Sequence, residues 1–323
     1  MSFARLQKKI DEKQNPTVVG LDPAIESIPP QILKKHIKEH GETLEAAALA
    51  VIEFNMNLID GLADIIPAVK PQSAYYEALG SFGVYALRQT CSYAKSKGLY
   101  VIVDGKRGDI GSTAEAYSAA YLGSVKVGNT ELMPFDADAL TVNAYLGSDG
   151  IKPFIETAEQ HDKAIFALVR TSNPSAIELQ DNLVINYDTN EDPRTSPPTT
   201  LYTTVGDLME RLSRKTIDEN GYTRVGAVVG ATYPDEMKFL RKRLKNTFFL
   251  VPGYGAQGGT AEDAALAFDK NGHGAIVNSS RGIIAAWKKS HAKTDKPVSS
   301  CEHYVEAARE EALKMRDDLR KFI

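Results

Sequence analysis

Eight short apolar runs recur along the chain, and longer helix-like stretches separate them. The runs cover residues 17–20, 66–70, 99–104, 139–143, 164–170, 225–230, 248–252 and 275–278. Strands that alternate with helices are typical of a parallel α/β fold, and eight is the number of strands that closes a TIM barrel. We therefore expect an α/β protein in which a single (β/α)8 TIM-barrel domain spans residues 1–323.

The stretches between the runs have helical patterns. Residues 42–62 are rich in Ala and Leu with apolar residues at helical spacing, and residues 81–97 are amphipathic. Pro234 precedes a third stretch, 235–244, where it suits the first turn of a helix. The last stretch, 301–322, is rich in Ala, Glu, Arg and Leu and predicts a C-terminal helix.

Two segments exceed a minimal barrel and are expected to be insertions. For residues 24–41, after the first strand, we expect a short extra helix. Residues 177–198, after the fifth strand, are rich in Asn, Asp and Pro and predict a long mobile loop. A loop there could close over the barrel as a lid, or it could be a disordered surface insertion, and the sequence leaves both open.

Composition excludes several classes of protein. The net charge of −4 and the isoelectric point near 5.9 argue against a nucleic-acid partner held by a general basic field. Cys91 and Cys301 form no C-x-x-C motif, which suits a reducing compartment. The N-terminus lacks the apolar core of a signal peptide, and no apolar run reaches the roughly 20 residues that span a bilayer. We expect a soluble, cytoplasmic protein without a membrane partner.

The third apolar run ends abruptly in a charged segment, Asp104-Gly105-Lys106-Arg107-Gly108-Asp109-Ile110-Gly111-Ser112-Thr113. In an extended backbone Asp104 and Lys106 project to the same side and can pair. Gly108 lets the backbone turn, and Ser112 or Thr113 could cap a helix that begins near Ala114. On spacing alone, the segment could equally be a surface loop with an incidental ion pair.

The pattern D-x-K-x-x-D-I-G-x-T in this segment resembles the signature of the orotidine 5'-phosphate decarboxylase family, whose members convert orotidine 5'-monophosphate (OMP) to uridine 5'-monophosphate (UMP). Five further blocks resemble the family's other strand ends in the family's order: Gly20-Leu21-Asp22-Pro23, Val69-Lys70-Pro71-Gln72-Ser73, Thr171-Ser172-Asn173-Pro174-Ser175, the glycine-rich 251–259 and Asn278-Ser279-Ser280-Arg281-Gly282-Ile283. The residues of these motifs and the length of the chain are most similar to the longer bacterial branch of the family, called type 2. Ser112 departs from the Asn that many members carry.

The resemblance implies roles for individual residues. The family's alternating charges map to Lys70, Asp104, Lys106 and Asp109, with Lys106 as the proton donor to C6 of the substrate. Asp109, together with Thr113, would reach into the site of the other subunit of a homodimer. The implied ligand contacts are Asp22 and Lys70 to the ribose, Ser172 to the pyrimidine, and Gln257 and Arg281 to the phosphate. The resemblance implies no metal and no cofactor, only the substrate OMP and the product UMP.

The positions of these residues relative to the expected strands also predict, independently of the family, that they lie together. If the eight runs form a barrel, seven of them lie at or just beyond strand carboxyl ends, the face where TIM-barrel enzymes act: Asp22, Lys70, Asp104, Lys106, Ser172, Gln257 and Arg281.

Four other interpretations compete. Residues 253–258 match G-x-G-x-x-G, but the next strand ends in Asn278-Ser279 rather than in the acid that would hold a ribose in a dinucleotide site. His36 and His40 could ligate a metal from one helix face, although a solvated face is the simpler interpretation. A metal-assisted relative of the same superfamily would carry an acid where Lys70 stands. A non-catalytic UMP sensor would be expected to lack part of the charged array.

Overall fold

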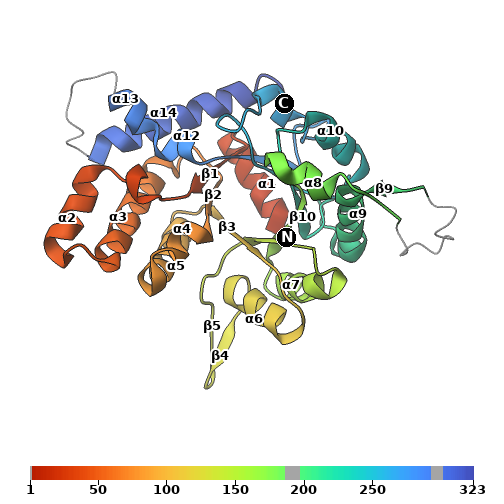
Figure 1. Ribbon diagram of the computed structural model, residues 1–323, viewed down its shortest axis with the longest axis horizontal. Helices are drawn as coiled ribbons and strands as arrows, with labels where there is room; N and C mark the ends of the chain where they lie inside the picture. Colours follow the sequence, from red (N-terminus) through yellow and green to blue (C-terminus); the bar gives the residue numbers. More distant parts are fainter. Residues whose placement is uncertain (1, 186–196, 292–300) are drawn as a thin grey trace.

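The computed structural model describes residues 2–185, 197–291 and 301–323. Eight parallel strands close into a barrel, and their order around it is the order of the chain. They are β1 (Thr17–Leu21), β2 (Ala68–Pro71), β3 (Tyr100–Arg107), β6 (Ala139–Val142), β7 (Ala164–Arg170), β10 (Val225–Val229), β11 (Phe249–Val251) and β12 (Ala275–Ser279). The predicted TIM barrel is therefore confirmed, with each strand at its expected apolar run (Figure 1).

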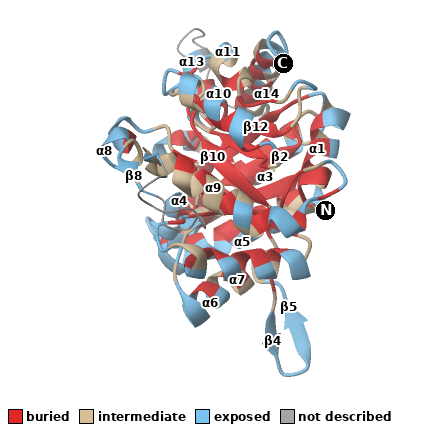
Figure 2. Ribbon diagram, turned by 90° about the vertical axis from the view of Figure 1, so that its right-hand side faces the viewer, coloured by how far each residue is buried: buried red, intermediate tan, exposed pale blue. Residues whose placement is uncertain are grey.

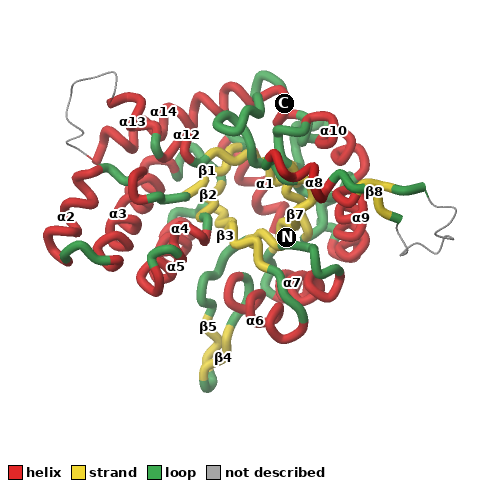
Figure 3. Tube along the Cα trace, in the orientation of Figure 1, coloured by secondary structure: helices red, strands yellow, loops and turns green. Residues whose placement is uncertain are grey.

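Helices surround the barrel on its outside (Figure 3). The longer ones are α2 (Pro30–His40), α3 (Leu44–Leu62), α5 (Gly80–Ser96), α6 (Gly111–Tyr121), α7 (Ser148–Gln160), α9 (Leu201–Ser213), α10 (Pro234–Arg243) and α14 (Cys301–Leu319). Shorter helices are α4 (Ser73–Glu77), α8 (Ile177–Gln180), α11 (Ala261–Ala265), α12 (Arg281–Ile284) and α13 (Ala286–His291). The helices expected over residues 42–62, 81–97, 235–244 and 301–322 are all present, as α3, α5, α10 and the C-terminal α14.

The strands are buried on both faces, as the red core of Figure 2 shows. One apolar cluster lies between the strands and the surrounding helices, and a second fills the barrel interior with residues such as Ile102, Phe166 and Phe248. Parallel strands covered in this way need apolar side chains on both faces, so their sequences are continuous rather than alternating apolar runs.

A helix that the sequence pattern did not indicate closes the amino-terminal end of the barrel. This helix, α1 (Ser2–Lys13), inserts Phe3, Leu6 and Ile10 into the interior cluster. The ring of Phe3 lies 4.9 Å from that of Phe166 and 5.0 Å from that of Phe248, centroid to centroid. One end of the barrel is thus sealed by an aromatic plug, which leaves the opposite end for a ligand.

The two expected insertions differ from each other. Residues 24–41 contain a 3-10 turn (Ile25–Ser27) and α2, so the extra helix is confirmed. In 177–198 the expectation of a loop is wrong for the described part, because α8 is followed by β8 (Leu183–Val184), which pairs with β9 (Thr199–Thr200). Buried Arg170 holds Gln180 and Asp181 at the end of α8, an interaction that local composition does not reveal. Residues 186–196 lie outside the described residues.

A second, unexpected hairpin consists of β4 (Val125–Val127) and β5 (Thr130–Leu132). It extends away from the body beneath α6 (Figure 1). Across the described residues, no helix combines the length and the apolar character that crossing a membrane requires.

The packing of α1 into the amino-terminal end of the barrel gives a first prediction. Because the side chain of Phe3 is fully enclosed among aromatic rings, Phe3→Ala should lower the free energy of unfolding by about 3–5 kcal/mol, measured by urea denaturation. Lys8→Ala on the same helix removes a side chain that is 77% exposed and should change it by less than about 0.5 kcal/mol. Equal stability of the two variants would contradict the role given to α1.

Candidate active site

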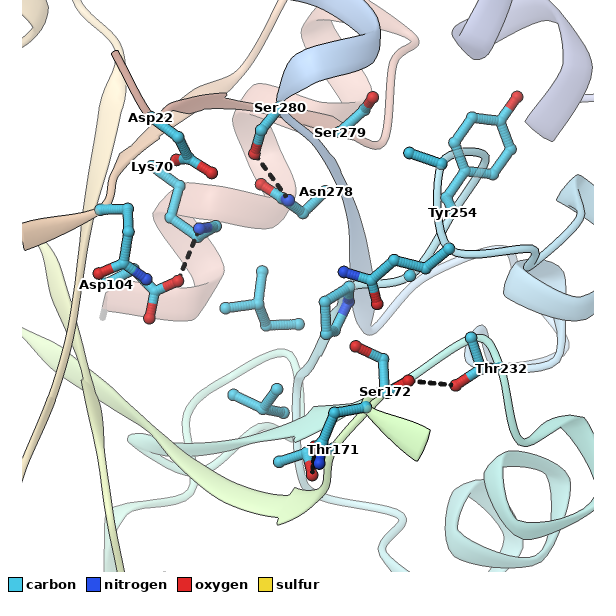
Figure 4. A pocket seen from close by; sticks show the side chains of 18 of the residues that line it. Asp22, Lys70, Asp104, Thr171, Ser172, Thr232, Tyr254, Asn278, Ser279 and Ser280 are labelled. Carbon is cyan, nitrogen blue, oxygen red and sulfur yellow. Dashed lines mark hydrogen bonds and ion pairs between the residues drawn. The ribbon is translucent and has the colours of Figure 1, made fainter. Parts of the chain in front are cut away.

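A cavity of about 1170 Å³ opens at the carboxyl ends of the barrel strands. Figure 4 shows part of its polar lining, which comes from β2, β3 and β12 and from the segments that follow β1, β7, β10 and β11. Seven of the residues expected from the sequence line it: Asp22, Lys70, Asp104, Lys106, Ser172, Gln257 and Arg281. The strand-end argument is thus supported by the geometry.

One carboxylate at the cavity floor binds two ammonium groups. Lys70 Nζ lies 2.7 Å from Asp104 Oδ2, and Lys106 Nζ lies 2.6 Å from Asp104 Oδ1. The side chain of Lys70 is 5% exposed and that of Asp104 10%, whereas that of Lys106 is 46% exposed. Both lysines line the cavity, but the side chain of Lys70 is nearly buried, whereas that of Lys106 is exposed.

The charges of this cluster are mutually stabilised. Burial by itself would lower the pKa of Lys70 and raise that of Asp104. The opposite charges outweigh it: Asp104 and Asp22 raise the pKa of Lys70, and Lys70 and Lys106 hold the pKa of Asp104 well below its usual range. At neutral pH the cavity floor therefore holds an ionised carboxylate and a charged, buried ammonium.

Strand β3 is longer than its apolar run predicted. The expectation that the strand ends at Asp104 is wrong, because strand geometry continues to Arg107. A bulge after Val103 accommodates the extra residues, and such irregularities re-aim side chains next to active sites. Beyond it, Arg107 turns away from the cavity toward Glu77 and Tyr121.

Asp22, directly after β1, lines the cavity with a carboxylate oxygen to which no described residue donates a hydrogen bond. Its Oδ1 atom is buried without a hydrogen-bond partner, and so is Oδ1 of Asn278 on β12. Buried polar atoms are nearly always bonded in folded proteins, so these two oxygens are suited to hydroxyl or amine donors of a ligand.

Ser172 lies in the loop after β7, where the backbone of Gly230 and that of Gly253 pack closely against it. A side chain at Gly230 would come within 2.9 Å of the backbone nitrogen of Ser172, and Gly253 has a φ of +98° that disfavours other residues. The carbonyl oxygen of Ser172 accepts a bond of 3.0 Å from the Thr232 hydroxyl. The close packing holds the backbone of Ser172 against its neighbours at the cavity wall (Figure 4).

Gln257 and Arg281 lie at the rim, and both are exposed. Among the described residues, neither side chain has a hydrogen bond or an ion pair. Gln257 belongs to the glycine-rich loop between β11 and α11, and Arg281 begins α12 directly after β12. A free guanidinium beside flexible amide donors suits a phosphate group.

Asp109 and Thr113 do not line the cavity. Helix α6 begins at Gly111 with Ile110 as its N-cap, so the expectation that Ser112 or Thr113 caps a helix near Ala114 is wrong. The helix thus starts three residues before Ala114, and its first residue, Gly111, has a positive φ of +53° that a glycine adopts readily. Asp109 instead bonds the backbone nitrogen of Ile110 at 2.8 Å.

Several lining residues escaped the sequence interpretation, chiefly Thr141 on β6 and Thr232 after β10. Thr141 stands inside the apolar run 139–143, where threonine is an ordinary strand former; its polar side chain between Leu140 and Val142 was the available signal.

A possible ligand set for a metal lies elsewhere, on α2. The ligand atoms of His36, Glu39 and His40 lie within 4.8 Å of one another, and none of the three lines the cavity. Nε2 of His36 is 2.8 Å from Glu53 Oε2 and the residue is buried, so the expectation of a wholly solvated face is wrong for His36.

Comparison with known proteins agrees with this geometry. The family model described as "Orotidine 5'-phosphate decarboxylase / HUMPS family" matches residues 18–294. The chain belongs to this family. An orotidine 5'-phosphate decarboxylase of Rhodopirellula baltica is 41% identical over 321 residues, 99% of each chain. One from Clostridium kluyveri is 40% identical over 99% of this chain and 98% of its own.

A solved structure of the same family has the same fold. The OMP decarboxylase of Leishmania donovani is 27% identical, with a TM-score of 0.67 over 98% of each chain. Alignments over 321 residues with the two bacterial decarboxylases agree with the long form expected from the sequence.

The charge cluster of this family member gives a second prediction, for stability. The pKa of Asp104 is lowered from the roughly 3.9 of an unfolded aspartate. Its stabilising effect is therefore complete above that value and lost as the pH falls through the lowered pKa. Asp104→Asn should cost about 3–5 kcal/mol of unfolding free energy from about pH 5 upward, and the deficit should shrink below about pH 4. Urea denaturation across this range measures it.

The exposed Asp149→Asn is the matched control and should change the unfolding free energy by less than about 1 kcal/mol. A deficit of Asp104→Asn that grows in acid would contradict the assigned sign of the pKa shift.

Proposed function

We propose that this protein decarboxylates OMP to UMP in the cavity at the carboxyl end of the barrel, as the last step of UMP synthesis. The observation that carries the proposal is Asp104, held between Lys70 and Lys106 at the cavity floor. The family membership supports the same reaction. Turnover of OMP by the purified protein, followed by loss of the substrate's absorbance, tests it.

Loss of carbon dioxide from OMP leaves an electron pair on C6 of a ring that delocalises it poorly. The protein must stabilise that carbanion and then protonate it. An ammonium fixed in advance in a site that excludes water does this effectively, because a single such donor is typically worth about 3–4 kcal/mol. Lys106 fits the role better than Lys70, because its side chain is 46% exposed at the cavity, whereas that of Lys70 is 5% exposed.

Asp104 would lie against the carboxylate of the substrate. Two negative charges in contact raise the free energy of the bound substrate more than that of the transition state, from which carbon dioxide departs without charge. Lys70, bonded to the other carboxylate oxygen, keeps Asp104 ionised for this purpose. The alternating charges thus act as one unit rather than as separate groups.

The rest of the ligand would be held by the polar residues of the wall and rim. The unpartnered Oδ1 of Asp22 and the ammonium of Lys70 suit ribose hydroxyls, and Ser172 suits the edge of the pyrimidine. Gln257 and Arg281 suit the phosphate. Contacts remote from C6 supply binding energy that orients the reacting ring.

Asp109 and Thr113 would complete the site of a second subunit in a homodimer. Both lie outside the cavity of their own chain, which supports this assignment. A two-fold dimer would contain two such shared sites.

The metal-assisted chemistry of other superfamily members is the main alternative. It requires an acid that binds a divalent ion at the end of the second strand, and Lys70 occupies that position with its charge already paired. Activity that survives EDTA would support metal-free decarboxylation. Binding of UMP without any turnover of OMP would instead indicate a sensor.

The proton-donor role gives a third prediction. Lys106→Ala should abolish decarboxylation while the folded protein still binds UMP, since the ammonium acts on C6 rather than on ribose or phosphate. Lys238→Ala, at an exposed position of α10, should retain wild-type rates. Activity of Lys106→Ala within about tenfold of wild type, only about 1.4 kcal/mol in the barrier, would exclude the assignment.

The shared site gives a fourth prediction. A dimer that pairs one Lys106→Ala chain with one Asp109→Ala chain carries both defects in one site and none in the other. Mixing the two inactive homodimers under exchange conditions should restore roughly a quarter of wild-type activity if the chains reassort at random. Verified heterodimers without recovered activity would mean that Asp109 acts within its own chain.

A further inference from the structure

The bulge in β3 displaces the very residues that carry the charge cluster. In the pairing of β3 with β6, Val103 lies opposite Leu140, and the next pair joins Arg107 to Val142. Strand β3 therefore advances four residues while β6 advances two. The segment between, from Asp104 to Lys106, cannot follow the regular ladder with β6, although Asp104 keeps a bridge to Gln72 on its other side. Another interaction must therefore hold the segment against β6.

The backbone of Lys106 shows the consequence. Its φ is +46°, in the left-handed region that residues with a side chain seldom occupy. Its N–H donates 2.9 Å to the hydroxyl oxygen of Thr141 rather than to a strand carbonyl. A side chain on the neighbouring strand thus replaces the missing backbone acceptor.

The same hydroxyl also serves the catalytic carboxylate. Thr141 Oγ1 donates 2.8 Å to Asp104 Oδ1, the oxygen that accepts from Lys106 Nζ. A hydroxyl has one proton to give and lone pairs to accept with, so both bonds form at once. Three hydrogen bonds therefore link Lys106, Thr141 and Asp104 in a ring. Lys106 takes part in two of them, through its backbone nitrogen and through its ammonium.

Thr141 is well placed to be rigid. Its residue is 1% exposed, and it lies in the middle of β6, paired with Phe166 of β7. It borders the cavity but has its hydroxyl occupied by protein groups. Figure 4 shows Asp104 beside Lys70 at this floor, where the second carboxylate oxygen is bonded to Lys70.

We propose that Thr141 is a positioning residue for the decarboxylation: its hydroxyl fixes the backbone of Lys106 and the carboxylate of Asp104 together, and so aims the ammonium at C6. This inference rests on the proposed function. Without the hydroxyl, the carboxylate can rotate and the backbone of Lys106 loses its acceptor, while the groups that bind ribose and phosphate stay in place.

Thr141→Val tests the inference with an almost unchanged side-chain shape. Valine suits a buried strand, so the barrel should fold. The turnover number for OMP should fall roughly 10- to 100-fold, the size expected when a buried donor beside a charge loses its partner. KM for OMP and the Kd for UMP should change less than about threefold, because the groups proposed to bind ribose and phosphate are unchanged.

Two controls separate positioning from packing. Thr141→Ser keeps the hydroxyl and loses a methyl group, so it should restore turnover to within about threefold of wild type. Thr17→Val changes another buried strand threonine, whose hydroxyl has no partner among the described residues, and should leave turnover unchanged. Should Thr141→Val not fold, Thr141→Cys replaces it, because a thiol bonds weakly.

The outcomes are distinct. Wild-type turnover in Thr141→Val, a rise in KM at unchanged turnover, or equal losses in Thr141→Val and Thr141→Ser would each overturn the inference. Failure of the wild-type protein itself to convert OMP would instead overturn the proposed function, and the inference with it. A selective loss of turnover in Thr141→Val that Thr141→Ser restores supports the positioning role.

Discussion

The carboxylate of Asp104 is the point on which the rest of the site depends. An ionised group with 10% of its side chain exposed is unfavourable in a protein interior unless it is paired and fully hydrogen-bonded. Here two ammonium groups and one hydroxyl share its two oxygens. The charged side chains that line the cavity, Lys70, Lys106, Arg281, Asp22 and Asp104, sum to one positive charge in a chain whose net charge is −4. Attraction of an anionic ligand is therefore local rather than a property of the whole surface.

A second buried charge supports the opposite wall. Arg170, at the end of β7, has no exposed side-chain surface, and its guanidinium lies 3.8 Å from the ring centroid of Tyr233. It pairs with Asp181 at 3.0 Å and with Glu236 at 3.7 Å, and so joins β7 to α8 and α10. Ser172 follows two residues later, so these interactions of Arg170 hold the start of the loop that is proposed to recognise the pyrimidine.

Residue patterns predicted the barrel because a parallel strand buried on both faces leaves an unmistakable apolar run, and they predicted seven cavity residues because strand ends converge. They could not predict interactions between residues distant in the chain. Thr141 looked like an ordinary strand former, since its importance arises from the β3–β6 register. In the same way, the end of α8 is held by Arg170, and the plug formed by α1 depends on rings contributed by β7 and by Phe248, just before β11.

The segment after the bulge leaves the cavity of its own chain, and the neighbouring surface gives this a physical rationale. Ile110 is 56% exposed, and the hairpin that follows α6 aligns Val125 with Leu132 across its two strands. Val127, two residues from Val125, shares that face, so the ribbon presents apolar side chains that are 44–62% exposed. A two-stranded ribbon with a bare apolar face is marginal in water. A second subunit would cover such surface and receive Asp109 in the same contact, which would tie catalytic competence to assembly.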